Sequence, residues 1–313
     1  MNRLTAVLLI VVVVYVSLAM CASASRSRRP HPNATQQHHV LPLDLTPEGL
    51  WAVHLTIGHR DVHCVVDTGS RHLCVDVPVD PTWVPLPGTP TIAYGTQTAT
   101  HVRWYNVPVQ FVGGDVVVVA VAVTGSRQCS TPRCFDILGL ARGPGSIVGV
   151  AEFARLRFEF PANGGASHLL LNPPATIATS KNRLPLVPHP SWYIVRIVGV
   201  YVRDGNIRRD VDMGEADTML VDTGANMLGV PPTHTRRMHD ALREGGDLVF
   251  RLQGEGDAVV EITVPMVMHG GTELLLDSYD THGHIVLGGR FMRGLSIELC
   301  STYVAIANCP PDQ

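Results

Sequence analysis

Two short segments of the chain carry the same residue types in the same order. Val65 to Ser70 reads VVDTGS, and Leu220 to Ala225 reads LVDTGA. Average amino-acid usage predicts roughly 0.05 copies of Asp-Thr-Gly in a chain of this size. Two copies, each preceded by two apolar residues typical of a strand, indicate a duplicated structural unit rather than chance.

The chemistry of these aspartates depends on whether folding brings them together. Two carboxyl groups a few Å apart cannot both ionise readily, so they share one proton. One group then acts as an acid and the other as a base toward the same water molecule, as general acid–base hydrolysis requires. We therefore predict that Asp67 and Asp222 form a catalytic pair. The alternative is two ordinary turn aspartates, which the duplicated context disfavours.

Each Asp-Thr-Gly is followed by a second matched phrase. FDILGLARG spans Phe135 to Gly143, and HIVLGGRF spans His284 to Phe291, at similar intervals from the two aspartates. We predict two β-rich half-repeats, in each of which the second phrase is a buried strand and turn that supports the Asp-Thr-Gly loop. The halves should meet near residues 182–192, where three prolines interrupt the strands.

The composition favours an all-β fold. The chain has 313 residues, of which 45% are hydrophobic, and this is enough for a sizeable core. Its 29 Gly and 23 Pro, with Val-rich runs between them, predict many short strands joined by turns. The best predicted helix spans Thr233 to Glu244 and is entered through Pro231 and Pro232. A net charge of −3 gives no basic surface for nucleic acid.

The N-terminus predicts export. An apolar run after Arg3 ends in Ala22-Ser23-Ala24, so residues 1–24 are interpreted as a cleaved signal peptide. The alternative is an uncleaved membrane anchor, since the run is nearly long enough to span a bilayer. Residues 25–39 form a short basic and His-rich leader, in which Arg26 to Arg29 is either a processing site or a solvated tail.

Asn33 begins an acceptor sequence for N-glycosylation, which agrees with a secreted protein or one in the lumen of the secretory pathway. Six cysteines would remain after signal cleavage, an even number that suggests disulfides among 15 possible pairings. The pairs that are close in sequence are Cys129/Cys134, Cys300/Cys309 and Cys64/Cys74, the last of which brackets the first Asp-Thr-Gly.

The chain has 15 histidines, two pairs of which are close enough in sequence to suggest metal-ligand spacing. The pairs His59/His63 and His282/His284 have no Cys or carboxylate partner at such spacing, so they are interpreted as solvated loop residues. The sequence therefore predicts neither a metal site nor a cofactor.

Taken together, these motifs resemble those of the pepsin-like aspartic proteases, and the resemblance covers about Leu41 to Cys309. It implies a mostly all-β, bilobal double β-barrel with pseudo-twofold symmetry and a few short helices. Residues 40–185 would form the N-terminal lobe with the first catalytic Asp and the flap. Residues 186–313 would form the C-terminal lobe with the second catalytic Asp.

The resemblance also implies roles for single residues. Asp67 and Asp222 would hold the attacking water, and the segment that begins AYGTQTAT at Ala93 resembles the flap hairpin. The residues implied to support the carboxyl groups or to bind substrate in the flap are Thr68, Gly69, Ser70, Thr223 and Gly224, and Tyr94, Gly95 and Thr96. The threonines would link the two loops through their hydroxyl groups, the glycine amides would bond the carboxylates, and the Ser70 hydroxyl would donate to Asp67.

The sequence departs from the family pattern in several places, and one of them is a shortened stretch between Asp67 and Tyr94. Ala225 stands where the family has Ser or Thr, so Asp222 lacks a hydroxyl donor to its charged form. Loss of such a donor raises a pKa, and we expect a pH optimum less acidic than that of pepsin. Cys74 stands where many relatives have a Trp that bonds the flap tyrosine. Residues 25–39 are shorter than the family's inhibitory pro-segment, so we expect secretion in an active form.

The function that we predict from the sequence is a secreted, monomeric aspartic endopeptidase. Its substrate would be a polypeptide in an extended conformation, and pepstatin-type inhibitors would bind in the same cleft. The alternative is a catalytically weak or inactive pepsin-fold module that binds peptides or proteins. A symmetric viral-type dimer is disfavoured because one chain carries both aspartates.

Overall fold

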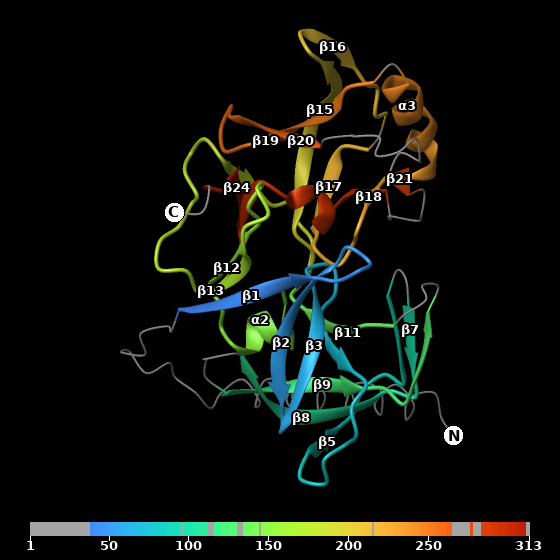
Figure 1. Ribbon diagram of the computed structural model, residues 1–313, viewed down its shortest axis with the longest axis vertical. Coiled ribbons are helices and arrows are strands. Elements are labelled where there is room, and N and C mark those ends of the chain that lie inside the picture. The colour runs from blue at the N-terminus through green and yellow to red at the C-terminus, as the bar shows by residue number, and fades with distance from the viewer. Residues whose placement is uncertain are drawn as a thin grey trace, which may run out of the picture. The chain divides into compact units, whose positions relative to one another are not determined.

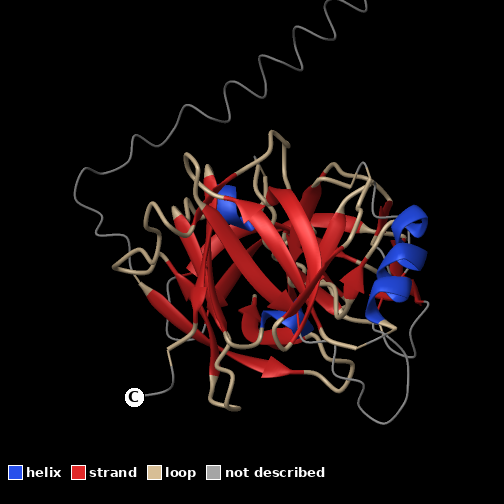
Figure 2. Cartoon of the chain, turned by 90° about the horizontal axis from the view of Figure 1, so that it is seen from above, coloured by secondary structure: helices blue, strands red, loops and turns tan. Residues whose placement is uncertain are grey.

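The computed structural model describes residues 38–94, 97–111, 116–129, 134–143, 145–214, 216–243, 245–264, 276–277 and 283–310. The predicted signal peptide, the glycosylation acceptor Asn33, most of the predicted leader and the flap residues Gly95 and Thr96 lie outside these ranges. The chain is mostly β-structure, as its composition predicted, and Figure 2 shows strands throughout with few short helices. Below, the first half means residues 38–185 and the second half means residues 186–310.

Six strands of the first half close into a barrel. Their order is β2 (Trp51–Ile57), β3 (Arg60–Asp67), β11 (Asp136–Gly139), β4 (Leu73–Val75), β9 (Val116–Val123) and β8 (Arg103–Phe111). The ring closes because β2 pairs with β3 on one side and with β8 on the other. β5 (Val84–Leu86) pairs with the beginning of β8, on the same edge that β2 meets at the end of β8 (Figure 1). Every second residue of β8 is buried, the alternation expected of a barrel strand with one face inside.

A second group of strands joins the two halves. It runs in the order β14 (Arg183–Pro185), β24 (Tyr303–Asn308), β23 (Leu295–Cys300), β12 (Arg155–Glu159), β13 (Ser167–Leu171) and β1 (His39–Leu45). β12 comes from the first half and pairs along its whole length with β23 of the second half. β1 also pairs with β2 through two residues, so this group is continuous with the barrel.

The second half adds a sheet of its own. Its order is β20 (Val259–Val264), β19 (Asp247–Gln253), β15 (Ile194–Asp204), β17 (Thr218–Asp222), β22 (Ile285–Gly288), β18 (Leu228–Gly229) and β21 (Leu276–Asp277), with β16 (Ile207–Asp210) beside β15. Residues 265–275 and 278–282 lie outside the description. The second barrel implied by the family resemblance therefore remains a prediction.

A three-stranded sheet and three helical segments complete the described fold. The sheet runs β10 (Ser126–Cys129), β7 (Gln97–Thr100) and β6 (Thr91–Ala93), and the helical segments are α2 (Ile147–Val150), α3 (Pro232–Leu242) and the 3-10 turn η2 (Gly289–Met292). α3 confirms the predicted helix. It begins at Pro232, and proline is tolerated in this first turn because the backbone N–H that it lacks would have no partner within the helix. No helix in the described ranges has the length and hydrophobicity needed to cross a bilayer.

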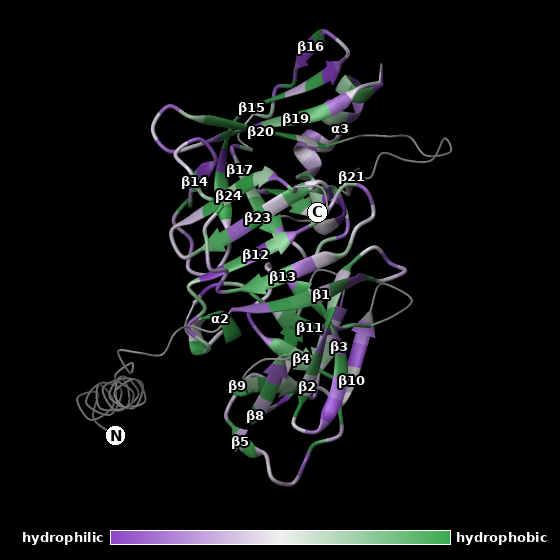
Figure 3. Cartoon of the chain, turned by 60° about the vertical axis from the view of Figure 1, so that its left-hand side comes forward, coloured by the Kyte–Doolittle hydropathy of each residue, from purple (hydrophilic) through white to green (hydrophobic). Residues whose placement is uncertain are grey.

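One hydrophobic core extends through both halves. Its fully buried members include Phe111 and Phe158 from the first half and Phe250 from the second. Figure 3 shows the hydrophobic residues gathered on the central strands, whereas the β15–β16 hairpin tip is hydrophilic. The continuous core and the β12–β23 pairing hold the two halves together. Asp67 is the last residue of β3 in the first half, and Asp222 is the last residue of β17 in the second half.

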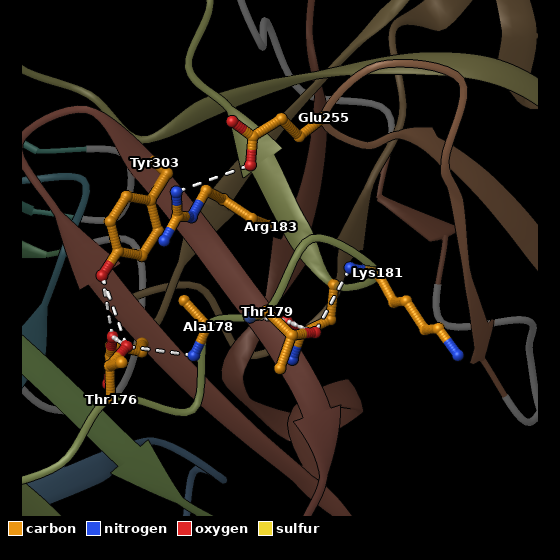
Figure 4. A network of polar contacts seen from close by, with 9 residues as sticks. Thr176, Ala178, Thr179, Lys181, Arg183, Glu255 and Tyr303 are labelled. Atoms are coloured by element: carbon orange, nitrogen blue, oxygen red, sulfur yellow. Dashed lines mark hydrogen bonds and ion pairs between the residues drawn. The ribbon is translucent and has the colours of Figure 1, made fainter.

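The segment that connects the halves is tied down by polar contacts (Figure 4). Glu298 of β23 is fully buried, and it accepts hydrogen bonds from the hydroxyl groups of Thr176 and Tyr303, the latter at 3.0 Å. A buried carboxyl group is tolerated only where such donors replace water. Arg183 lies over the Tyr303 ring at 4.8 Å and contacts Glu255 at 3.5 Å. The connection is therefore anchored to β23 and β24.

Two of the suggested cysteine pairs are not formed. Cys64 and Cys74 are buried thiols on β3 and β4. β11 lies between these strands, so the two backbones are about 9.5 Å apart, whereas a disulfide joins Cα atoms about 4.4–6.8 Å apart. Burial also raises the pKa of both thiols.

Cys300 and Cys309 are thiols as well. Cys300 lies beside the β23–β24 turn, whereas the residue before Cys309 pairs with Leu295 at the opposite end of the hairpin. Cys134 is disulfide-bonded.

Candidate functional site

Each Asp-Thr-Gly loop lies at the end of a strand in the same local arrangement. In the first half, Asp67 ends β3, which is parallel to β11, and β11 is antiparallel to β4 on its other side. In the second half, Asp222 ends β17, which is parallel to β22, and β22 is antiparallel to β18. Asp67 pairs with Gly139, and Asp222 pairs with Gly288. The second repeated phrase therefore lies beside each aspartate, as predicted from the sequence.

The glycine of the second phrase is required by the loop that follows each aspartate. A Cβ atom at Gly139 would lie 2.4 Å from the backbone nitrogen of His72. A Cβ atom at Gly288 would lie 2.3 Å from the carbonyl oxygen of Met227. Any side chain there would push these loops away, so glycine allows the close backbone approach that holds each aspartate in place.

The two aspartates meet. Their carboxyl groups share a hydrogen bond, and Asp67 is only 8% exposed. The Gly69 amide donates to Asp67 Oδ1 at 2.8 Å and to Asp222 Oδ1 at 3.2 Å. The Gly224 amide donates to Asp222 Oδ1 at 2.9 Å. Both carboxyl groups are thus oriented by backbone amides and directed toward each other.

The threonines lock the two loops together with four hydrogen bonds. The Thr68 hydroxyl donates to the Val221 carbonyl at 2.8 Å and accepts from the Thr223 amide at 3.0 Å. The Thr223 hydroxyl donates to the Val66 carbonyl at 2.7 Å and accepts from the Thr68 amide at 3.2 Å. Thr68 is fully buried and Thr223 is 1% exposed, so water cannot replace these partners.

The glycines of the two loops face the opposite aspartate. A Cβ atom at Gly224 would lie 2.3 Å from Asp67 Cγ, and one at Gly69 would lie 2.6 Å from Asp222 Oδ2. Only glycine fits as the third residue of each Asp-Thr-Gly, because a side chain there would overlap the carboxyl group of the aspartate from the other half. Each glycine both donates an amide hydrogen bond and leaves the space that the partner carboxyl group occupies.

The two carboxyl groups differ in their remaining donors. Asp67 accepts from the Ser70 hydroxyl and, at 3.0 Å, from the Ser70 amide. The corresponding residue in the second half is Ala225, which has no hydroxyl group. Burial raises the pKa of Asp67, and the Ser70 hydroxyl opposes this increase. Burial and the charge of Asp67 raise the pKa of Asp222 well above its usual value. The Ser70 donors therefore favour the charge on Asp67 and the shared proton on Asp222.

A shared proton makes stability depend on pH. Unfolded aspartates lose their protons near pH 3.8, whereas the folded pair keeps one at higher pH. The stability that the shared proton adds is fully present below the pKa of the unfolded aspartates. It is lost as the pH rises through the higher pKa of the folded pair. Between these two pKa values, the free energy of unfolding of the wild type should fall by up to about 1.4 kcal/mol per pH unit more than that of Asp222→Asn, which has no such proton. Urea unfolding at several pH values measures the difference.

The matched control for this measurement is Asp217→Asn. Asp217 lies five residues before Asp222, is half exposed and pairs with Arg196 at 2.9 Å. The Asp217→Asn variant should show the same pH dependence of the free energy of unfolding as the wild type, because an exposed ion pair contributes little to stability. Identical slopes for the wild type and Asp222→Asn would contradict a buried shared proton.

The predicted flap is a β-hairpin, as the sequence indicated. β6 and β7 are antiparallel, and Thr91 pairs with Thr100 at one end and Ala93 with Thr98 at the other. Beyond these pairs, the Tyr94 amide donates to the Gln97 carbonyl at 2.8 Å. The Tyr94 side chain packs with Cys74 and Ala99, and its hydroxyl lies beside the Cys74 thiol. Burial and that neighbour raise the pKa of Tyr94, so its hydroxyl stays neutral.

Two cross-half contacts were not predicted from the sequence. The Trp192 indole donates to the Gly69 carbonyl at 2.8 Å, and Arg71 donates to the Ser191 hydroxyl. Both join the segment after the prolines to the first Asp-Thr-Gly loop. The sequence placed Ser191 and Trp192 only at the junction of the two halves, and no sequence spacing relates them to Gly69.

The histidine pairs suggested by sequence proximity are rearranged. His63 stacks on His54 of the neighbouring strand rather than on His59, which is exposed in the β2–β3 turn. His284 Nδ1 lies 2.7 Å from the Thr218 hydroxyl, and His282 lies outside the described residues.

The comparisons with known proteins add no family assignment. No protein-family profile matches the chain, and no curated protein sequence matches it. The function must therefore be inferred from the geometry of the site.

Proposed function

We propose that the protein is a single-chain aspartic endopeptidase with the pepsin-like bilobal fold. The observation that carries this proposal is the hydrogen-bonded pair of carboxyl groups of Asp67, which is buried, and Asp222, which is partly buried, each at the end of a matching strand. Four buried hydrogen bonds from Thr68 and Thr223 hold the pair together. A structural ion pair does not account for this arrangement, because two acids of like charge repel each other unless they share a proton.

The donor asymmetry assigns a role to each acid. Asp67 is the base, because Ser70 stabilises its charged form. It takes a proton from a water molecule held between the two groups, while the protonated Asp222 donates a hydrogen bond to the scissile carbonyl. The hydroxide left by this water attacks the carbonyl carbon while the carbonyl oxygen takes the proton of Asp222, which gives a tetrahedral diol. The diol collapses when the C–N bond breaks, as Asp67 passes its proton to the leaving amine and a diol hydroxyl returns a proton to Asp222. No covalent bond to the enzyme forms at any step.

The hairpin of β6 and β7 is the proposed substrate cover. β6 is the terminal strand of its sheet, and Tyr94 lies at its end next to the turn. An extended polypeptide binds such an element through main-chain hydrogen bonds, which orient the substrate without selecting its sequence. The apolar N-terminal run supports the further proposal that the enzyme works in the secretory lumen or outside the cell.

The experiment is a cleavage assay on the purified full chain. Denatured protein substrate is incubated between about pH 3 and pH 7, with and without pepstatin, and the products are identified by mass spectrometry. We expect endoproteolytic fragments that pepstatin suppresses, with maximal activity at a pH above the optimum of pepsin. EDTA and serine- or cysteine-protease inhibitors should have no effect.

Other outcomes distinguish the alternative. Pepstatin binding without cleavage would replace the proposal with a pepsin-fold peptide-binding module. Cleavage that ignores pepstatin would remove the dyad from the mechanism. A strongly acidic optimum would contradict the role assigned to Ala225.

A further inference from the structure

Three polar side chains converge on an exposed face away from the two aspartates. They come from three adjacent strands: Asp44 from β1, His54 from β2 and His63 from β3. His54 and His63 are direct cross-strand partners, and Asp44 pairs with Ala52, two residues before His54 on the same face. Sequence spacing cannot reveal this group, because only the strand register brings the three side chains together.

The three side chains already point at a common centre. His54 Nε2 lies 3.4 Å from Asp44 Oδ2, and His63 Nε2 lies 3.7 Å from the same oxygen. One ligand atom from each residue lies within 4.8 Å of the others. The imidazole rings are stacked with their centroids 4.5 Å apart and their planes at 22°. Both histidines therefore present the same nitrogen in the same direction.

These spacings match those around a tetrahedral metal ion. Bonds of about 2.0–2.1 Å to imidazole nitrogen and carboxylate oxygen place neighbouring ligand atoms about 3.3–3.4 Å apart. The two measured His–Asp distances need to shorten by only a few tenths of an ångström. All three side chains are between 41% and 60% exposed, so small rotations into this geometry meet little resistance.

We propose that Asp44, His54 and His63 bind a divalent transition-metal ion of the zinc type, with water completing the coordination. Two imidazoles and one carboxylate are the donors that Zn²⁺ and its neighbours prefer, whereas Mg²⁺ and Ca²⁺ prefer oxygen alone. The proposal does not depend on the proposed peptidase function.

A bare ion pair is the simplest competing explanation of the group. In that case two charged imidazoles would stack against each other, with a single carboxylate between them. Two charged rings with centroids 4.5 Å apart would repel each other, so stacked imidazoles that converge on one carboxylate oxygen are better explained by a shared cation.

The ion would brace the start of the first half. It would link β1, β2 and β3, and β3 carries Asp67 four residues after His63, about 13 Å along the strand. A ligand that binds only the folded protein raises its stability. The site is therefore expected to stabilise the fold without contacting the dyad.

The experiment measures Zn²⁺ binding to the untagged full chain by isothermal titration calorimetry. Because the chain has other histidines, the informative quantity is the difference between the wild type and the double variant His54→Ala/His63→Ala. We expect this difference to be one Zn²⁺ per chain. Asp44→Asn should weaken the binding at least about tenfold, since even groups that only orient a ligand change affinity by 10–100-fold. Zn²⁺ should raise the urea midpoint of the wild type and leave that of the double variant unchanged, whereas Mg²⁺ should raise neither.

His59→Ala and Asp61→Asn are the matched controls. His59 is exposed in the adjoining turn, and Asp61 lies on the same face of β3 and accepts from the Thr56 hydroxyl at 3.0 Å. Both variants should bind Zn²⁺ as the wild type does. Urea unfolding without metal checks that each variant folds, and anomalous scattering from Zn²⁺-soaked wild-type crystals should give a peak among the three side chains. Equal binding by the wild type and the double variant would overturn the proposal.

Discussion

Peptide cleavage by Asp67→Asn and by Asp222→Asn is expected to fall between about 10²- and 10⁴-fold in kcat/KM. Asparagine keeps the size and shape of each side chain and can still accept from the Gly69 and Gly224 amides. It cannot take a proton from water in place of Asp67, and it cannot supply the shared proton in place of Asp222. Each substitution therefore removes the chemistry of the pair and leaves most of the surrounding structure.

The matched control is again Asp217→Asn, whose half-exposed carboxyl group pairs with Arg196 outside the dyad. Its kcat/KM should equal that of the wild type. Urea unfolding of all three variants separates lost chemistry from lost structure. If either dyad variant folded and retained wild-type activity, the observed cleavage would belong to another site or to a contaminating protease.

The site was predictable because its geometry is encoded in a repeat. Asp67 and Asp222 occur in the same phrase, and each has a matched partner strand that contains Gly139 or Gly288. A duplicated unit folds twice in the same way, so matching sequence positions become matching places in space. The Ser70 and Ala225 difference was also visible in the sequence, because it occurs inside the aligned phrases.

What the sequence could not predict depends on register and strand order. Cys64 and Cys74 are ten residues apart, yet β11 enters between their strands and prevents a disulfide. His63 was compared with His59, its neighbour in the chain, although its partner in the sheet is His54. A shift of one residue in the pairing would move every such side chain to the other face. Spacing along the chain therefore fails wherever the contact crosses strands.

Thr68→Val is expected to lower the free energy of unfolding, because two backbone groups lose their hydrogen-bond partner, the Thr68 hydroxyl. Each unsatisfied buried group should cost roughly 1–3 kcal/mol. Valine has nearly the shape of threonine, so packing is preserved. The Val221 carbonyl loses its donor and the Thr223 amide loses its acceptor, and both lie where Thr68 is fully buried. Urea unfolding measures the change, and the pH slope attributed to the shared proton should decrease as the loops separate.

Thr223→Val should behave in the same way, because its hydroxyl makes the symmetric contacts with Val66 and Thr68. The double variant should lose less stability than the sum of the single variants, since either substitution already loosens the one interface that both residues hold. Thr56→Val is the control, because its hydroxyl donates to the exposed Asp61 carboxylate and its loss should cost less than about 0.5 kcal/mol. Equal costs at Thr56 and Thr68 would mean that the hydroxyl contacts do not hold the loops together, and the approach of the two aspartates would then require another cause.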